Sequence, residues 1–289
     1  MRPLSKLRPG YSLLEVMVVI GMALIVLALI VPAVVRGREA SNSVICQDHL
    51  KNLAMAALLH HNERGVLPPY STGRPGELYG SWFTHLLPYL NEQSLYNLIR
   101  EGDVAPGGKS IFEPGAMLQD PNNQAFDVLK CQSDPTAAAM PEFGKTNYLG
   151  NWFSLSDTTR GIYSGPRRLK DLCDGPATVV LFAEAYAVCD KLARLALVSS
   201  QFHNFGITQD NKPSDDPSYA PDDFTMFQTM PSAGPGPDGC HKWRTQTPHA
   251  VMHVAMGDGS VRRVNPSISP ENWKHGLKPS DGQPLPTDE

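Results

Sequence analysis

The stretch "GYSLLEVMVVIGMALIVLALIVPAVV", residues 10–35, decides how the start of this chain is built. From Val16 to Val35 it has no charged side chain, and an apolar helix of this length, about 30 Å, spans the hydrocarbon core of a bilayer. One carboxylate, Glu15, stands at the edge of the run, where a charge costs free energy unless it has a partner. The pattern predicts a transmembrane helix over 11–35 and raises the question of what faces Glu15.

The residues before the apolar run set its orientation. Arg2, Lys6 and Arg8 precede it with no acid among them, and basic flanks stay on the cytoplasmic side of a membrane. A secretory signal has a shorter apolar core and a small-residue cleavage site, and neither is found here. Hydropathy alone therefore predicts a single-pass anchor with its N-terminus in the cytoplasm and the bulk of the chain outside.

The helix is predicted to continue beyond the membrane, over 36–64. Small and apolar residues recur there in steps of three and four, which is typical of an amphipathic helix. Gly65 and then Pro68-Pro69 are expected to end it. The stripe consists of Cys46, Leu50, Leu53, Ala54, Ala57, Leu58 and His61.

The remaining sequence is large enough for a globular domain, which we place at 65–276. Its 24 glycines and 26 prolines, counted over the whole chain, predict many turns and long loops. The net charge of −4 argues against nucleic acid as a partner. After Gly276 the sequence is polar and rich in proline, so 277–289 is predicted to be a disordered tail.

Three stretches carry recognisable local signals. "SWFTHLLPYL", residues 81–90, predicts a short core helix interrupted at Pro88, and "ATVVLFAE", residues 177–184, predicts a buried strand. In "AVMHVAMGDGSVRRV", residues 250–264, Asp258-Gly259 joins two strand-like runs as a hairpin turn would. Together with the long helix, these signals predict an α+β fold in which the helix packs on a mainly antiparallel, loop-rich β domain.

The five cysteines form no CxxC pair, so neither a zinc ribbon nor a thioredoxin-type motif is present. If the domain is exported, one or two disulfides with a thiol left over are expected. The cysteines are Cys46, Cys131, Cys173, Cys189 and Cys240.

The segment "GYSLLE", Gly10 to Glu15, resembles the type IV prepilin signature. The resemblance implies that a prepilin peptidase cleaves the basic leader, residues 1–10, after Gly10 and that Tyr11 is then N-methylated. It also implies a partner for Glu15, namely the N-terminal amine of a neighbouring subunit. Tyr11 stands where Phe is commoner, and Pro32 is the 22nd residue counted from Tyr11, where many pilins have a helix-kinking proline.

A second resemblance covers most of the remaining chain and is to the DUF1559 family of large, pseudopilin-like bacterial proteins. Several stretches match in the expected order, which is more specific than any one of them. They are "CQDHLKNLAMAALLHHNERGVLPP" (46–69), "SWFTHLLPYLNEQSLYN" (81–97), "LKCQSDP" (129–135), "TNYLGN" (146–151), "LKDLCDGPATVVLFAE" (169–184) and "HVAMGDGSVRRV" (253–264).

Two details follow from this second resemblance. Cys46 and Cys131 lie in family-like stretches, and we predict a disulfide between them, which requires Cα atoms within about 7 Å. The family often has a His, nine residues and then Asp-Gly near its end. Here eight residues separate His249 from Asp258, and the usual glycines are Ala250 and Val251, so the role of His249 stays open.

Ligand sites are weakly signalled. "DVAPGGKS", residues 103–110, lacks the first glycine of a phosphate loop and reads as a surface loop. Four carboxylates in an acidic loop could bind calcium, but the EF-hand spacing is absent and a solvated loop is the simpler interpretation. Those carboxylates are Asp215, Asp216, Asp222 and Asp223.

Metal binding and catalysis are also weakly supported. The pairs His60-His61 and His249/His253 have no Cys or carboxylate spaced to complete a metal site, so we interpret them as packing or surface histidines. No metal or other cofactor beyond the weak calcium candidate is predicted. The sequence lacks GxSxG, HExxH and paired glycosidase signatures, so it is predicted not to be an enzyme.

Two functions remain open. The first is a pseudopilin-like structural subunit of a type II secretion or type IV pilus-like assembly in a bacterial inner membrane, with its domain in the periplasm. Its partners would be the prepilin peptidase/methyltransferase and other pilin-like subunits. The second is a membrane-tethered periplasmic binding module that does not polymerise, which the large loop-rich domain favours.

Overall fold

The computed structural model describes the chain in segments and divides it into two compact units, Met1–Asn42 and Ser43–Glu289. The first unit consists, where described, of helix. The second unit contains the sheet and the hydrophobic core. The described residues are 12–72, 80–102, 104–105, 109–110, 127–141, 144–156, 166–196, 226–234, 238–241 and 244–286.

Helix α1, Leu13–Arg64, is the longest element, with 52 residues and Pro32 in its interior. It begins where the apolar run begins and ends at Gly65, whose φ of +75° is the left-handed conformation that commonly terminates helices. The Gly65 amide donates to the carbonyl oxygen of His61 at 2.7 Å. The predicted single helix and its end at Gly65 are thus confirmed, while the kink at Pro32 stays a prediction.

The second half of α1 is the core helix of the second unit. Its side chains follow the predicted three-and-four spacing, but the buried histidine is His60 rather than His61, which is only partly buried. The unit begins at Ser43, so this half of the helix belongs to the same compact unit as the globular domain predicted at 65–276. Its buried residues are Cys46, Leu50, Leu53, Ala54, Ala56, Ala57 and His60.

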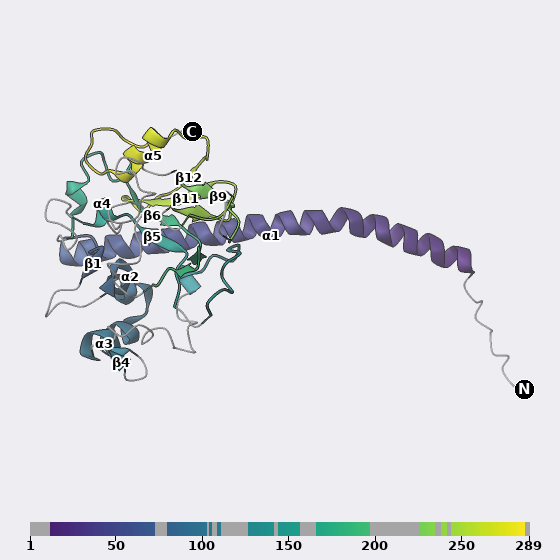
Figure 1. The fold of residues 1–289 in the computed structure, drawn as a ribbon, viewed down its shortest axis with the longest axis horizontal. Coiled ribbons are helices and arrows are strands. Elements are labelled where there is room, and N and C mark those ends of the chain that lie inside the picture. The colour runs from purple at the N-terminus through teal and green to yellow at the C-terminus, as the bar shows by residue number, and fades with distance from the viewer. Residues whose placement is uncertain are drawn as a thin grey trace, which may run out of the picture. The chain divides into compact units, whose positions relative to one another are not determined.

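A four-stranded antiparallel sheet lies beside this half of α1 (Figure 1). Its strands are β5, Tyr148–Gly150; β6, Val180–Glu184; β11, Met252–Met256; and β12, Val261–Val264. Their order is β12-β11-β6-β5, so β6 and β11 are central. All residues of β6 and β11 are buried, which confirms the buried strand predicted within 177–184.

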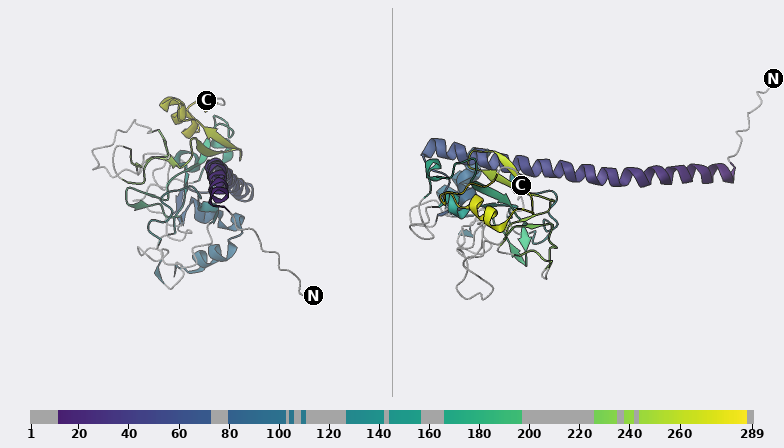
Figure 2. Two further views of the ribbon diagram at one scale, coloured as in Figure 1. Left: turned by 90° about the vertical axis from the view of Figure 1, so that its right-hand side faces the viewer. Right: turned by 90° about the horizontal axis from the view of Figure 1, so that it is seen from above.

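The β11–β12 hairpin confirms the turn predicted at Asp258-Gly259. Gly259 has φ +83°, which a residue with a Cβ adopts only with strain. The Lys51 ammonium donates to the Gly259 carbonyl at 2.7 Å, so the turn rests on α1. The right-hand view of Figure 2 shows the second half of α1 running along one side of the domain.

The predicted core helix at 81–90 divides at the proline, as expected. Helix α2, Trp82–Leu86, is followed by the 3₁₀ helix η1, Leu87–Leu90, which contains Pro88. The Trp82 ring packs on Phe182 of β6 with ring centroids 4.6 Å apart. This contact joins the segment to the sheet.

The other elements are short and surround this core. Strands β9 and β10 pair in parallel, and β1–β2, β3–β4 and β7–β8 pair antiparallel, so the described sheet structure is mainly antiparallel. The α+β class is therefore confirmed. The elements are β1 Ser71–Thr72, β2 Gly80–Ser81, α3 Gln93–Gly102, β3 Val104–Ala105, β4 Lys109–Ser110, η2 Asp127–Leu129, α4 Trp152–Leu155, η4 Leu169–Asp171, β7 Val188–Cys189, β8 Leu192–Ala193, β9 Gln228–Thr229, β10 Gln246–Thr247 and α5 Pro270–Leu277.

The structure differs from the predicted disordered tail at 277–289. Leu277 ends α5, and Leu285 is buried against the domain. The amides of Asp281 and Gly282 donate to the two carboxylate oxygens of Asp174, each at 2.9 Å. A buried leucine and hydrogen bonds to Asp174 therefore help to hold a polar, proline-rich stretch as far as Pro286.

Candidate functional site

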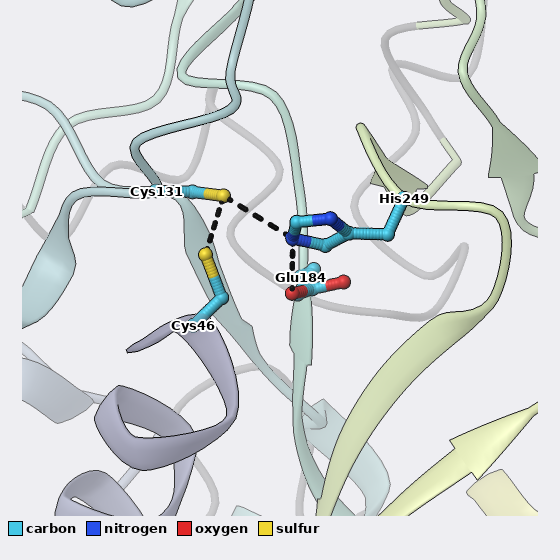
Figure 3. Close-up of side chains that lie close together, drawn as sticks. All are labelled: Cys46, Cys131, Glu184 and His249. Atoms are coloured by element: carbon cyan, nitrogen blue, oxygen red, sulfur yellow. Dashed lines mark hydrogen bonds and ion pairs between the residues drawn. The ribbon is translucent and has the colours of Figure 1, made fainter. Parts of the chain in front are cut away.

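Four buried side chains from distant parts of the sequence meet in the second unit: Cys46, Cys131, Glu184 and His249 (Figure 3). One potential ligand atom from each lies within 4.8 Å of all the others. We call these four residues the Cys-His-Glu cluster. Because cysteine, histidine and glutamate are the side chains that bind transition metals, this is the chemically most distinctive group among the described residues.

The four residues of the cluster come from four separate segments of the chain. Cys46 lies on the buried face of α1, and Cys131 follows η2. Glu184 is the last residue of β6, and His249 lies between β10 and β11. The cluster therefore joins the core helix to β6, to the segment that precedes β11 and to the η2 loop.

The position of Cys131 is fixed by a buried polar network around Asp134. The Asp134 carboxylate accepts from the side-chain amide of Asn147 at 2.6 Å and from the Ala187 amide at 2.9 Å. Asn147 in turn accepts from the Cys131 amide at 2.9 Å. Because buried polar groups are costly when unpaired, this network holds the loop firmly against β5 and the segment after β6.

Glu184 is almost fully buried, at 1% exposed, and three donors hold its carboxylate. The Thr247 hydroxyl donates to Oε2 at 2.5 Å, and the His253 backbone amide donates to the same oxygen at 3.2 Å. The His253 ring places Nδ1 2.9 Å from Oε1. Thr247 also accepts from the His249 amide at 3.1 Å, so one threonine positions both the carboxylate and the histidine.

The two cysteines are in very close contact. Their Sγ atoms are 2.6 Å apart, and both are thiols in this structure. The distance lies between an S–S bond of about 2.05 Å and ordinary contact. The predicted Cys46–Cys131 disulfide therefore stays a prediction, although the fold brings the two sulfurs together.

The cluster favours one thiolate at neutral pH. The hydrogen bond from Cys131 lowers the pKa of Cys46 to about 6, more than burial raises it, and His249 also lowers it. The same hydrogen bond, with burial, raises the pKa of Cys131. Cys46 is thus the ionised member of the pair and Cys131 the donor.

A buried thiolate beside a histidine suggests nucleophilic catalysis, but this geometry does not provide it. Nε2 of His249 lies 3.6 Å from both Cys131 Sγ and Glu184 Oε1. In a catalytic triad the acid holds the ring nitrogen opposite the nucleophile, whereas here both groups face the same nitrogen. Cys46 and Cys131 are also 0% and 2% exposed, so both are closed off from solvent in this structure.

Glu15, the residue that raised the first question, has a partner within its own chain. Its carboxylate Oε2 accepts from the Ser12 amide at 3.1 Å, and its amide donates to the Ser12 hydroxyl at 3.2 Å. This reciprocal pair is a capping box, and the pattern S-x-x-E was readable in "SLLE". The partner predicted for Glu15 lay outside the chain, so this local partner was not foreseen.

The remaining predicted site residues are less informative. Gly10, Tyr11 and the acidic loop with Asp215, Asp216, Asp222 and Asp223 lie outside the described residues. His60 is buried and its Nδ1 lies 2.9 Å from the Val66 carbonyl oxygen, which supports the packing interpretation. Val104–Ala105 and Lys109–Ser110 of the rejected phosphate loop form the short β3–β4 pair.

No Cys or carboxylate is spaced in the sequence to complete a site around His249, yet the fold brings Cys46, Cys131 and Glu184 beside it. Sequence spacing could not show it, because the four cluster residues are 53 or more positions apart from their sequence neighbours in the cluster. A weaker signal did exist. Cys46, Cys131 and Glu184 each lie in a separate family-like stretch, so three of those stretches meet at this point of the fold.

A disulfide that the sequence did not assign joins Cys189, at the end of β7, to Cys240. It lies beside the buried Tyr186 ring, whose hydroxyl donates to the Pro231 carbonyl at 2.9 Å. The domain thus contains a disulfide, but between a different pair of cysteines from the predicted Cys46 and Cys131. Cys173 is a free, exposed thiol.

The fold defines an α+β protein whose apolar N-terminal helix continues as the core helix of an antiparallel-sheet domain. The model of the SBP_bac_10 family, described as a protein of unknown function (DUF1559), matches residues 36–271, and the chain belongs to that family. The match starts after the apolar run, so the prepilin-like signature lies outside it. A search of curated proteins found no match, and neither did a search of solved structures.

Proposed function

We propose that this protein is a membrane-inserted, pilin-like structural subunit whose leader is removed by a prepilin peptidase after Gly10. The observation that carries the proposal is helix α1, which is apolar and exposed in its first half and is the core helix of a β domain in its second half. The first half of α1 is long and apolar enough to cross a membrane. Length and composition alone do not distinguish a pilin-like helix from a simple membrane anchor or a signal sequence. The continuous helical second half favours the pilin-like form.

The exposed apolar surface needs a medium other than water. Between Leu13 and Val35 most large side chains are about half exposed or more, from 46% for Val16 to 80% for Leu13. Such a surface is stable in lipid or against the same surface of neighbouring helices. A pilin-like subunit uses both environments in turn, first the bilayer and then the helical bundle of an assembly.

The location follows from the same reasoning. We place the N-terminus in the cytoplasm of a bacterial inner membrane and the second unit in the periplasm. The Cys189–Cys240 disulfide supports this, because disulfides persist in oxidising compartments. The partners are the prepilin peptidase/methyltransferase and other pilin-like subunits, and the role is structural rather than enzymatic.

The first test is mass spectrometry of the mature N-terminus of protein isolated from native membranes. We expect a chain that begins at Tyr11 and is methylated there. A chain that retains residues 1–10 contradicts the proposal and favours the tethered binding module. A chain that begins beyond Val35 identifies the apolar segment as a secretion signal instead.

The second test asks what Glu15 does in the mature protein. A photocrosslinking residue at Leu27, which is 54% exposed, reports contacts between neighbouring helices. Glu15→Gln keeps a side chain that can serve the capping box but removes the charge, whereas Ser12→Ala weakens the capping box and keeps the charge. We expect Glu15→Gln to abolish the crosslinks and Ser12→Ala to retain them, with leader cleavage intact in both.

The reverse pattern gives Glu15 a purely local role. If crosslinks survive Glu15→Gln but weaken in Ser12→Ala, the carboxylate acts only as a helix cap. The charge then has no partner on a neighbouring subunit, and the fibre hypothesis is abandoned in favour of the tethered module.

A further inference from the structure

The Cys-His-Glu cluster is not explained by a pilin-like role, since that role rests on helix α1 and the packing of the domain. A disulfide between Cys46 and Cys131 would account for the two cysteines. It would not account for the buried Glu184 carboxylate or for His249 and His253 beside it. Burial of ionisable groups costs free energy unless they are paired or bind a metal. What therefore needs explaining is why four such side chains converge.

Their geometry is close to that of a tetrahedral metal site. Two ligands at about 2.0–2.3 Å from one zinc ion lie roughly 3.3–3.8 Å apart. Nε2 of His249 is already 3.6 Å from both Cys131 Sγ and Glu184 Oε1. The two sulfurs, at 2.6 Å, must move apart by about 1 Å, and the other separations in the cluster are within 4.8 Å.

We propose that Cys46, Cys131, His249 and Glu184 bind one thiophilic divalent cation of the zinc class when both cysteines are reduced. Two thiolates and an imidazole suit zinc, and one carboxylate oxygen completes four ligands. A hard ion such as calcium requires six to eight oxygens, which this cluster does not offer. All four ligands come from the protein and are buried, so the site is structural rather than catalytic.

The surrounding charges fit a cation. Two thiolates and a carboxylate carry −3 and a zinc ion carries +2, so the cation offsets most of the negative charge that these ligands bring into the buried site. Thiolates are the metal-binding form of cysteine, so metal binding releases any proton that the two sulfurs still hold.

His253 is the residue that orients the carboxylate. Its Nδ1 lies 2.9 Å from Glu184 Oε1, and its Nε2 lies 3.3 Å from the Ser43 hydroxyl on α1. A ligating carboxylate held in this way is typical of metal sites. His253 therefore acts as a positioning residue and not as a ligand.

The test uses the full chain in mild detergent, reduced with a phosphine and titrated with zinc against a chromogenic chelator. We expect one equivalent of zinc per chain. Cobalt(II) added to the same reduced protein should give the absorption of a tetrahedral site with thiolate ligands. Failure of the wild-type protein to give either signal overturns the proposal, whatever the variants do.

Variants then assign the ligands. Cys46→Ser and Cys131→Ser should each weaken zinc binding at least 100-fold and shift or abolish the thiolate–cobalt bands. His253→Gln should weaken binding about 10- to 100-fold with those bands kept. The matched control, Cys173→Ser, replaces an exposed thiol outside the cluster and should leave affinity and spectrum unchanged.

The competing outcome is a permanent disulfide. If reduced protein binds no zinc, and mass spectrometry of unreduced protein finds Cys46 joined to Cys131, the cysteines form a crosslink and the proposal fails. Zinc binding unaffected by Cys46→Ser also contradicts it. None of these readouts depends on cleavage after Gly10 or on crosslinks at Leu27, so the metal site and the pilin-like function can fail separately.

Discussion

At the scale of single residues, burial in the domain lowers the pKa of two histidines, His60 and His85. His85 is the clearest among the histidines. Burial, together with the nearby positive charges of His60 and Arg64, lowers its pKa to about 3. The T-shaped contact between the His60 and His85 rings, with centroids 6.3 Å apart, shows how closely the two are packed.

This burial makes stability depend on pH. The pKa of an unfolded histidine is about 6.5, so between pH 6.5 and 3 the unfolded chain binds a proton that folded His85 does not. His85 therefore costs no stability above pH 6.5, and the protein loses stability, by up to about 1.4 kcal/mol per pH unit, as the pH falls below it. Urea unfolding of the detergent-solubilised chain at pH 7, 6, 5 and 4 measures this slope.

His85→Leu removes the titrating group at a buried position. We expect a shallower loss of stability between pH 6 and 4 than in the wild-type protein. Part of the slope should remain, because burial also lowers the pKa of His60. Equal slopes in the two proteins would show that His85 is not a source of the acid sensitivity.

At the scale of elements, the β11–β12 hairpin turn packs closely on the core helix α1, so the turn must fit the helix surface. Gly259 has φ +83°, and a Cβ there would lie 3.0 Å from Leu58 Cδ1 and 3.3 Å from Met55 Sδ, both on α1. The turn therefore needs glycine for two reasons, its backbone conformation and its contact with the helix. The sequence indicates only the first reason.

Two alanine variants separate these reasons. Gly282 has φ +79° and open space around it, so Gly282→Ala measures conformational strain alone, about 1–2 kcal/mol. Gly259→Ala should cost about 1 kcal/mol more, because its Cβ also crowds α1. Urea unfolding followed by tryptophan fluorescence gives both values. An equal cost for the two substitutions would mean that the helix yields freely at the turn.

At the scale of the whole molecule, the second unit is held by long-range connections more than by long elements. Apart from α1, every described helix and strand has ten residues or fewer. The Cys189–Cys240 disulfide closes a separation of 51 residues across such short segments. Restricting the unfolded chain in this way stabilises the folded one.

Replacing both cysteines tests this contribution. The double variant Cys189→Ser/Cys240→Ser should lose up to about 4 kcal/mol of unfolding free energy, as the chain-entropy relation gives for a loop of this size. Cys173→Ser, which removes a free and exposed thiol, is the matched control and should change little. A double variant as stable as the control would show that packing alone holds these segments.

Much of this architecture was predictable from local sequence. The apolar run, the small-residue stripe after it and Gly65 predicted α1 nearly to its ends, because helix periodicity and helix termination are short-range properties. The strand ending at Glu184 and the turn at Asp258-Gly259 were predictable for the same reason. The described part of the tail was mispredicted, because the burial of Leu285 and the hydrogen bonds to Asp174 outweigh the polar composition around them.

The sequence by itself determined that α1, β6 and the β11–β12 hairpin are helix and strand, that the first part of α1 requires an apolar environment, and that the chain belongs to an α+β class. Only the tertiary structure decided which cysteine pairs with Cys240 and that Glu184 and His249 stand beside Cys46 and Cys131. The physical reason is the separation, along the sequence, of the residues that interact. Periodicity, capping and turn conformation depend on residues a few positions apart. The cluster depends on how α1, β6 and the segments around them pack together, and the disulfide depends on how β7 meets the segment that contains Cys240.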